Sequence, residues 1–386
     1  MPEVANRMDL QVSPPPFQST TILDGIVERE EQGVLVLGPA HGQPLRRVLH
    51  VNGYGGRYVW ERVKHGILPR HQLLGCPELA RMGYEIALAE PLQPDFYLYH
   101  KPLPHDLKLL KFIRSWLGPD GILYCGHNCL YWLPFLKMLG AIRCPLVSVL
   151  YAREPLNFSR VHTGILSLTP AGADQARKLS PRAKVAHFGW GVDLEFFPEI
   201  PYNPEWFLSC GIANRDFRTL AGAAAKCRHQ IRVICPGRSK GVVWPSNVTL
   251  IDGGPGWLTD KTKAITPRDV VRDYFPHSAA TLIIMKTDRI EYTANGFTNL
   301  IEAMAVGQPV IMTKTGALPG EIDVENTGCG IFVPPENPDA LAEAIDFLGN
   351  NPDKAKAMGQ KGRQLVERYY NIERYARDLH GFFEGL

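Results

Sequence analysis

The segment from residue 295 to residue 313 holds the side chains whose types and spacing are best suited to chemistry. In it Gly296, Thr298 and Asn299 open an expected helix that carries Glu302 one turn further along. Backbone N–H groups and a hydroxyl at a helix N-terminus suit a diphosphate. A carboxylate one turn later can accept hydrogen bonds from both hydroxyls of a ribose. An ordinary capped helix with an exposed glutamate would contain the same residues, because single caps are common.

Three basic side chains earlier in the chain could neutralise a diphosphate. Arg215 and Arg218 follow an expected strand that ends at Gly211, and Lys240 follows the next expected strand. An arginine can donate bidentate hydrogen bonds to phosphate oxygens, and it stabilises a departing anion without transferring a proton. The alternative for each of the three is a solvated surface charge.

The first half of the chain has its own candidates, a histidine and three glycines that follow strand-like runs. His127 comes directly after the run Ile-Leu-Tyr-Cys-Gly, and Gly53, Gly55 and Gly56 come after Arg-Val-Leu-His-Val. A polar side chain at the carboxyl end of a parallel strand is well placed for a ligand, and glycine lets the backbone approach one closely. A structural histidine and a plain tight turn are the alternatives.

The elements that must position these residues alternate between short buried strands and helices, which predicts an α/β protein. A proline-rich linker at 196–205 divides the series into two halves. Two Rossmann-like, doubly wound parallel-sheet domains facing a central cleft would bind ligands at the carboxyl ends of their strands. The predicted strands are 46–51, 85–89, 121–126, 145–151, 164–168, 184–188, 206–211, 231–235, 248–251, 280–284 and 308–313. The predicted helices are one whose last turns lie at 78–83 and those at 105–117, 129–139, 217–227, 299–306, 338–348, 352–370 and 372–384.

Composition limits the class of protein. The chain has 386 residues, of which 45% are hydrophobic and 21% charged, with a net charge of +3. These values exclude a disordered or fibrous chain and argue against binding nucleic acid through bulk charge. The eight cysteines, including Cys125 and Cys129, lack the second ligand pair of a structural zinc site, so we expect reduced thiols in a cytoplasmic protein. Residues 1–20 contain no signal peptide and are expected to form a disordered arm.

Several stretches resemble, in the same order, the retaining nucleotide-sugar glycosyltransferases of the GT-B fold, the glycosyl transferases group 1 family that includes glycogen and sucrose synthases. The resemblance covers about residues 46–386. It implies an N-terminal extension at 1–45, an acceptor-side domain at 46–200, a nucleotide-sugar-binding domain at 201–371, and a terminal helix at 372–386 that packs back on the first domain. The stretches that carry it are Gly55-Gly56 with 78–85, 165–169 with 191–197, 296–313, and 328–335 with 339–345.

The resemblance also implies roles around the helix at 299–306. Glu302 matches the second glutamate of the family's Glu-x7-Glu motif, which holds the ribose. The first glutamate falls at Ala294, so that Asn295 or Glu291 would have to take its place. The run Gly296-Phe297-Thr298 matches a branch with a Gly-x-Thr pattern, in which Thr298 and the N–H of Asn299 would contact the diphosphate.

The remaining implied roles concern the donor sugar and the charge of its diphosphate. His127 stands where family members place a histidine that faces the donor sugar. Arg215 is the first choice for the cation that neutralises the diphosphate, Arg218 the second and Lys240 the third. The implied catalytic set is therefore His127, Arg215 and Glu302, and Gly55, Gly56 and Gly211 are implied to lie close to the donor.

The implied activity is retaining transfer of a sugar from a nucleotide-diphosphate-sugar to an acceptor hydroxyl, without a metal, a cofactor or a protein general base. The acceptor could be a saccharide, a lipid-linked molecule or a small molecule, and nucleic acid is not expected as a partner. Two alternatives stay open. One is a sugar-nucleotide epimerase of the same fold, which would need carboxylates for proton abstraction, and the other is a non-catalytic nucleotide- or carbohydrate-binding homologue.

The segment Leu107–Leu117 is basic and partly amphipathic. Such a helix could rest on an anionic membrane, which would make the protein membrane-peripheral. Its apolar residues lie nearly all round the helix, which favours a buried crossover helix instead.

Overall fold

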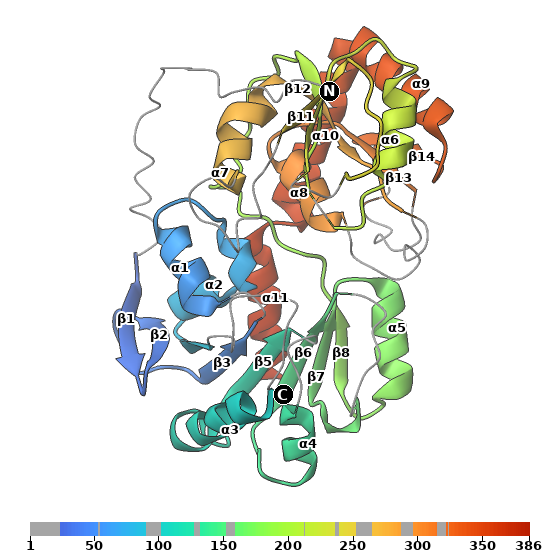
Figure 1. Cartoon of the computed structure of the whole chain (residues 1–386). Coiled ribbons are helices and arrows are strands. Elements are labelled where there is room, and N and C mark those ends of the chain that lie inside the picture. Colours follow the sequence, from blue (N-terminus) through green and yellow to red (C-terminus); the bar gives the residue numbers. More distant parts are fainter. Residues whose placement is uncertain are drawn as a thin grey trace. The chain divides into compact units, whose positions relative to one another are not determined.

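The computed structural model describes residues 24–52, 55–89, 102–126, 132–151, 159–211, 213–235, 239–251, 265–286, 296–314, 322 and 324–386, apart from the side chains of 102–106 and 159. Backbone contacts divide the described chain into two compact units (Figure 1). The N-terminal unit ends at Gly191 and also contains Ile372–Leu386, and the C-terminal unit is Val192–Asn371. The sequence analysis placed this division at residue 200.

The sheet of the N-terminal unit has eight strands in the order β1-β2-β4-β3-β5-β6-β7-β8. From β3 to β8 neighbouring strands are parallel, as predicted. The sheet is doubly wound because its order reverses at β3, which lies between β4 and β5. The strands are β1 (Ile26–Glu31), β2 (Val34–Pro39), β3 (Arg47–Val51), β4 (Glu85–Ala89), β5 (Ile122–Gly126), β6 (Leu146–Leu150), β7 (Gly164–Ser167) and β8 (Lys184–His187).

Strands β1 and β2 correct the prediction that residues 1–45 form an extension outside the first domain. They make an antiparallel hairpin, and β2 pairs antiparallel with β4. The two-residue turn at Gln32 (φ 51°) and Gly33 (φ 80°) has the backbone twist that tight hairpins require. On β4 the carboxylate of Glu85 forms ion pairs with Arg29 and Arg47, which ties the hairpin to the sheet.

Helices cover both faces of this sheet. The π-helical turn Ile113–Leu117 continues α3, and the two pack Leu109, Phe112 and Trp116 against Leu49 and Leu123. One side of this segment is therefore buried, as expected of a crossover helix, whereas Leu107, Lys108, Lys111 and Arg114 are exposed on its other side. The helices are α1 (Gly56–Lys64), α2 (Cys76–Arg81), α3 (Pro102–Phe112), α4 (Leu133–Met138), α5 (Pro170–Leu179), α11 (Ile372–Glu384) and the short 3-10 turns Arg70–Leu73 and Ser159–Val161.

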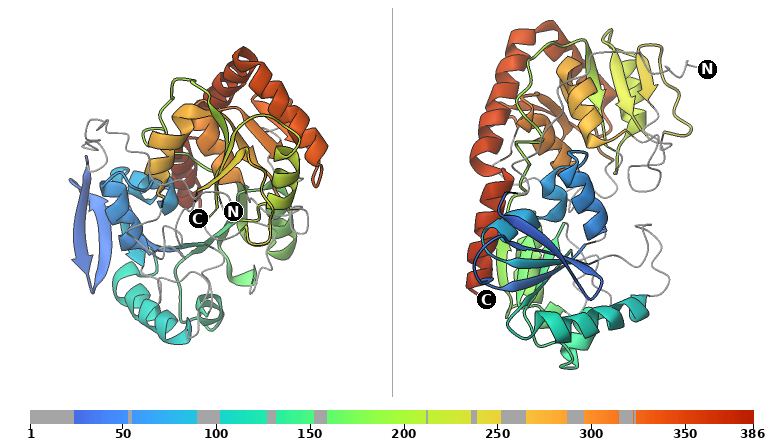
Figure 2. Two further views of the ribbon diagram at one scale, coloured as in Figure 1. Left: turned by 45° about the horizontal axis from the view of Figure 1, so that its top comes forward. Right: turned by 90° about the vertical axis from the view of Figure 1, so that its left-hand side faces the viewer.

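Helix α11 belongs to the N-terminal unit although it ends the chain (Figure 2). The hydroxyl of Tyr375 lies 3.0 Å from that of Tyr124 on β5, and the hydroxyl of Tyr84 lies 2.8 Å from Nδ1 of His380. Its contact with β7 depends on Gly164, because an added Cβ there would lie 2.6 Å from Cε1 of Phe382. These contacts hold the helix against the sheet of this unit.

The sheet of the C-terminal unit has six parallel strands in the order β11-β10-β9-β12-β13-β14. This order is that of a doubly wound nucleotide-binding fold, and it reverses between β9 and β12. The prediction of two doubly wound α/β sheets is confirmed. The elements are β9 (Trp206–Ser209), α6 (Phe217–Ala224), β10 (Ile231–Ile234), β11 (Val248–Ile251), α7 (Pro267–Asp269), β12 (Ser278–Ile283), α8 (Phe297–Ala305), β13 (Val310–Thr313), β14 (Gly330–Val333), α9 (Pro338–Asn350) and α10 (Pro352–Tyr369).

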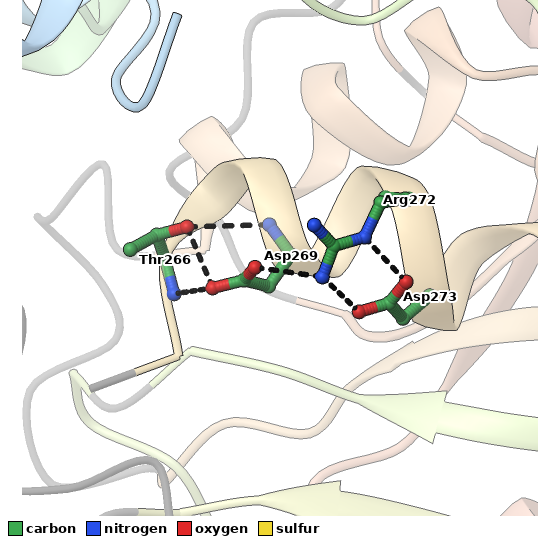
Figure 3. A network of polar contacts seen from close by, with 4 residues as sticks. All are labelled: Thr266, Asp269, Arg272 and Asp273. Atoms are coloured by element: carbon green, nitrogen blue, oxygen red, sulfur yellow. Dashed lines mark hydrogen bonds and ion pairs between the residues drawn. The ribbon is translucent and has the colours of Figure 1, made fainter. Parts of the chain in front are cut away.

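The entry into β12 is a helical segment that the sequence analysis did not predict. Thr266 and Asp269 form a capping box: the Thr266 hydroxyl accepts from the N–H of Asp269, and the Asp269 carboxylate accepts from the N–H of Thr266 (Figure 3). Arg272 then pairs with Asp269 at 3.1 Å and with Asp273 at 2.6 Å. The capping box satisfies N–H groups at the start of α7 that the helix itself leaves unbonded.

Candidate functional site

The candidate residues of the C-terminal unit lie where its strand order reverses, at the carboxyl ends of β9 and β12. Cys210 and Gly211 directly follow β9, and Met285 lies two residues beyond the end of β12. The segment after Gly211 returns to β12, because the N–H of Asp216 donates to the carbonyl of Ile284 at 2.8 Å. Open α/β sheets bind ligands in the crevice at this point.

Arg215 is held at this edge of the sheet by three acceptors. Its Nη1 donates to the carbonyl of Ala213 at 2.9 Å and lies 2.9 Å from Sδ of Met285. Its Nη2 donates to Oδ1 of Asn299, on the first turn of α8. The side chain therefore joins the ends of both switch-point strands to the start of α8.

The charge of Arg215 is buried without compensation by these partners. The residue is 4% exposed, and none of the three acceptors carries a negative charge. In the described part of the chain its Nε–H is buried without an acceptor. Burial lowers the pKa of Arg215 to about 10, so the guanidinium stays charged at neutral pH. A buried charge is costly unless it is paired, so an anion bound beside Arg215 would stabilise its charge.

The N-terminus of α8 is a second feature that attracts negative charge, because it carries the partial positive charge of the helix dipole. Gly296 precedes the helix with φ 84° and provides no side-chain cap, and the first turn has no acidic residue. The N–H groups of Phe297, Thr298 and Asn299 come before the first N–H that bonds within the helix, that of Leu300 to the carbonyl of Gly296 at 2.9 Å. Unbonded N–H groups and the helix dipole attract a negative charge to such an end.

Glu302 lies one turn into α8, as the spacing predicts, and is half-buried. Its Oε2 accepts from Nδ2 of Asn299 at 3.4 Å. Burial, reinforced by the carboxylate of Glu302, raises the pKa of the Cys210 thiol to about 12. Asn299 thus lies between the guanidinium of Arg215 and the carboxylate of Glu302 and contacts both.

Gly211 is required by the packing of this group. Its φ is 98°, and an added Cβ would lie 2.1 Å from Oδ1 of Asn299 and 2.6 Å from Nη2 of Arg215. The absence of a side chain at this position therefore allows the Arg215–Asn299 hydrogen bond to lie against the end of β9. The sequence analysis named Gly211 but missed the side-chain roles of Asn299, Cys210 and Met285. Cys210 and Met285 could have been recognised from the sequence, because they follow β9 and β12, which are neighbouring strands.

The other predicted cations are not part of these contacts. Arg218 is an exposed residue of α6, and Lys240 is exposed in the turn 239–241. Neither takes part in the hydrogen bonds that join Arg215, Asn299 and Glu302. Asn295, Glu291 and Ala294 lie outside the described residues.

In the N-terminal unit, Gly55 and Gly56 follow β3, the strand where the order of that sheet reverses. Gly55 precedes α1, and an added Cβ on Gly56 would lie 2.7 Å from Cβ of Leu88 on β4. Gly56 therefore allows close packing of α1 on the sheet. His127 and Gly53 lie outside the described residues, so the predicted role of His127 stays a prediction.

Two further observations concern metal ions and membrane-spanning helices. In the described ranges no three His, Cys, Asp or Glu side chains are grouped so that they could hold a metal ion. No helix of the described chain is long and apolar enough to cross a bilayer. Seven cysteines are buried free thiols, and Cys129 lies outside the described residues.

Comparison with known proteins identifies the part of the chain that contains α8. Residues 278–365 match the model of the family described as glycosyl transferases group 1. This segment belongs to that family. It contains Asn299 and Glu302 but begins after Arg215.

A curated relative supports the same assignment over a short stretch. An uncharacterized glycosyltransferase of Methanocaldococcus jannaschii is 35% identical over 69 residues, which is 18% of this chain. The chain spans about a fifth of the length of this relative, since the match covers 19% of it.

Solved structures match nearly the whole chain and show its fold. Sucrose-phosphate synthase from Thermosynechococcus elongatus has a TM-score of 0.62 at 16% identity and covers 89% of this chain and 99% of its own. HepE of Anabaena, in complex with UDP-glucose, has a TM-score of 0.60 at 11% identity, and the match covers 88% of this chain and 100% of HepE. A trehalose-phosphate synthase from Burkholderia vietnamiensis has a TM-score of 0.61 at 11% identity, and the match covers 88% of this chain and 97% of the synthase. The chain has the GT-B fold.

Proposed function

We propose that this protein transfers a sugar from a nucleotide-diphosphate-sugar to an acceptor hydroxyl. The observation that carries the proposal is the buried guanidinium of Arg215, which has no charged partner among its three acceptors and lies beside the uncapped start of α8. A diphosphate is the ligand that these two features fit together, because it offers several anionic oxygens to one site.

In the proposed complex, Arg215 and the N–H groups of Thr298 and Asn299 bind the diphosphate. As the bond to the sugar breaks, negative charge grows on the diphosphate oxygens, and fixed donors in a buried site stabilise that charge without reorganising. Glu302 accepts hydrogen bonds from the ribose hydroxyls, as the resemblance to the family implies.

The comparisons support the class of donor. HepE, a GT-B structure of the same fold, is described in complexes with UDP and with UDP-glucose. We extend to this chain only the chemistry shared by such donors, a nucleoside diphosphate joined to a sugar. Retention of the anomeric configuration and independence from metal ions are part of the proposal and rest on the family resemblance.

The decisive experiment measures donor hydrolysis or transfer with a panel of UDP-, GDP-, ADP- and dTDP-sugars. We expect Arg215→Met and Glu302→Gln each to reduce turnover of the accepted donor by about 10²-fold or more, on the scale of removing one transition-state donor. Matched controls are Arg368→Met and Glu343→Gln, which change exposed residues of α10 and α9. Turnover at the wild-type rate in both site variants would refute the assignment.

The same panel separates the alternatives. An isomerised donor would indicate the epimerase, and binding without turnover would indicate a non-catalytic homologue. For an active transferase, the anomeric signals of the product in proton NMR test retention. Turnover that survives a chelator tests metal independence.

A further inference from the structure

Helices α3 and α4 of the N-terminal unit carry a face that sugar transfer does not use. One side of α3 is buried in the core through Leu109 and Phe112, and the other side is exposed to solvent. We name the exposed surface of these two helices the α3–α4 face. Its principal side chains are Lys108, Lys111, Arg114, Trp132, Met138 and Leu139.

The apolar part of this face is unusually exposed for large side chains. Trp132 is 43% exposed, Met138 52% and Leu139 64%, and Leu107 on α3 is 49% exposed. Single exposed apolar residues need no explanation, but several on neighbouring elements mark an interaction site.

The two helices form one surface because their inner sides share a core. Leu110 of α3 and Leu136 of α4 both pack against the same buried cluster. The Nε of Arg114, in the turn that continues α3, donates to the carbonyl of Ala141 just beyond α4 at 3.3 Å. Figures 1 and 2 show both helices at the same end of the N-terminal unit.

The charged side chains that the structure describes on the α3–α4 face are all basic; the side chain of Asp106, also on α3, lies outside the described residues. Residues 107–117 and 132–143 contain five Lys or Arg and no Asp or Glu. Lys137 turns away from this set, because its Nζ donates to the carbonyl of Cys144 at 2.6 Å. The turn of the β1–β2 hairpin borders this face, because the side chain of Gln32 in that turn donates a hydrogen bond to the hydroxyl of Ser115. The neighbouring acidic residue, Glu31, forms an ion pair with Arg29.

We propose that the α3–α4 face rests on the surface of an anionic lipid bilayer. The cations would lie among the anionic headgroups, and the exposed Trp, Met and Leu side chains would enter the boundary between headgroups and acyl chains. Lipid fits better than nucleic acid, because phosphate backbones offer no apolar phase for Met138 and Leu139. The proposal does not depend on the sugar transfer proposed above.

Co-sedimentation of the whole protein with vesicles tests this proposal without a sugar donor. We expect binding to vesicles of 70% phosphatidylcholine and 30% phosphatidylglycerol, weakening as salt rises, and no binding to pure phosphatidylcholine vesicles. A basic side chain near an anionic surface contributes about fivefold to the partition coefficient. The variant Lys108→Gln/Lys111→Gln/Arg114→Gln should therefore bind roughly 100-fold more weakly, and Leu139→Gln should also bind more weakly.

The matched control is Arg177→Gln/Lys178→Gln/Arg182→Gln, which removes three exposed cations at and just beyond the end of α5 in the same unit. It should keep wild-type vesicle binding, and unchanged circular dichroism should show that every variant is folded. Equal loss in the control and the α3 variant would mean that net charge, not this face, drives binding. No binding to anionic vesicles, or binding to a fluorescent DNA duplex in their place, would overturn the proposal. Donor turnover, measured separately in solution, tests the sugar transfer alone.

Discussion

Replacing Gly211 by alanine tests whether the Arg215–Asn299 pair forms the binding site. The residue has φ 98°, and the new Cβ would lie 2.1 Å from Oδ1 of Asn299 and 2.6 Å from Nη2 of Arg215. Both atoms belong to residues proposed to bind the diphosphate, Arg215 through its guanidinium and Asn299 through its backbone N–H. They must move before an alanine can be accommodated.

The magnitude follows from two separate costs. Holding alanine at a positive φ costs about 1–2 kcal/mol, and overpacking a filled site costs typically about 1–3 kcal/mol. We therefore expect the free energy of unfolding to fall by about 2–5 kcal/mol. A displacement of about 1 Å in a positioning group can lower turnover by roughly 10²-fold, so donor turnover should fall far more than stability alone explains.

The assay combines thermal unfolding, nucleotide binding by calorimetry and turnover of the accepted donor. Gly42→Ala is the matched control, because Gly42 has φ 86° and no heavy atom within 4 Å of an added Cβ. It should show only the backbone cost of about 1–2 kcal/mol and wild-type turnover. If Gly211→Ala binds nucleoside diphosphate and turns over donor as the wild type does, the pair is not the site.

Three further predictions follow from other contacts. Asn299→Asp should weaken UDP binding measured by calorimetry by about tenfold or more, because a carboxylate would compensate the charge of Arg215; unchanged affinity would contradict this reasoning. Gly164→Ala should lower the melting temperature by several degrees, because its Cβ would lie 2.6 Å from Cε1 of Phe382; an unchanged melting temperature would mean that α11 does not need this close packing. Burial opposes ionisation of Glu85, but hydrogen bonds from two arginines outweigh it and hold the pKa of the carboxyl below 4.5. Glu85→Gln should therefore lower stability above about pH 4.5, and the difference from wild type should vanish as the pH falls through the lowered pKa; a difference that persists in acid would show that ionisation is not its cause.

Much of the fold could be predicted from the sequence because its strands are short, apolar and bounded by turns. The strands at Glu85–Ala89 and Val248–Ile251 and the helix at Ile372–Glu384 have the predicted bounds, and most other predicted elements within the described chain differ by only a few residues at their ends. The β1–β2 hairpin was missed because Ile26–Glu31 is mostly charged and its alternation is weak. Its stability comes from pairing with β2 and from Glu85, which lies far along the chain.

The sequence by itself determined that Glu302 lies one turn into a helix, because a helical spacing is local, and it named Arg215 and Asn299 as candidates. It ranked Arg215 before Arg218 only through the family resemblance, since both residues follow the same strand. The tertiary structure decided between them: Arg215 turns inward to the ends of β9 and β12, and Arg218 is exposed. Burial and the loss of solvation depend on what the rest of the chain places around a side chain. The uncompensated charge that indicates an anion site therefore became visible only in the folded protein.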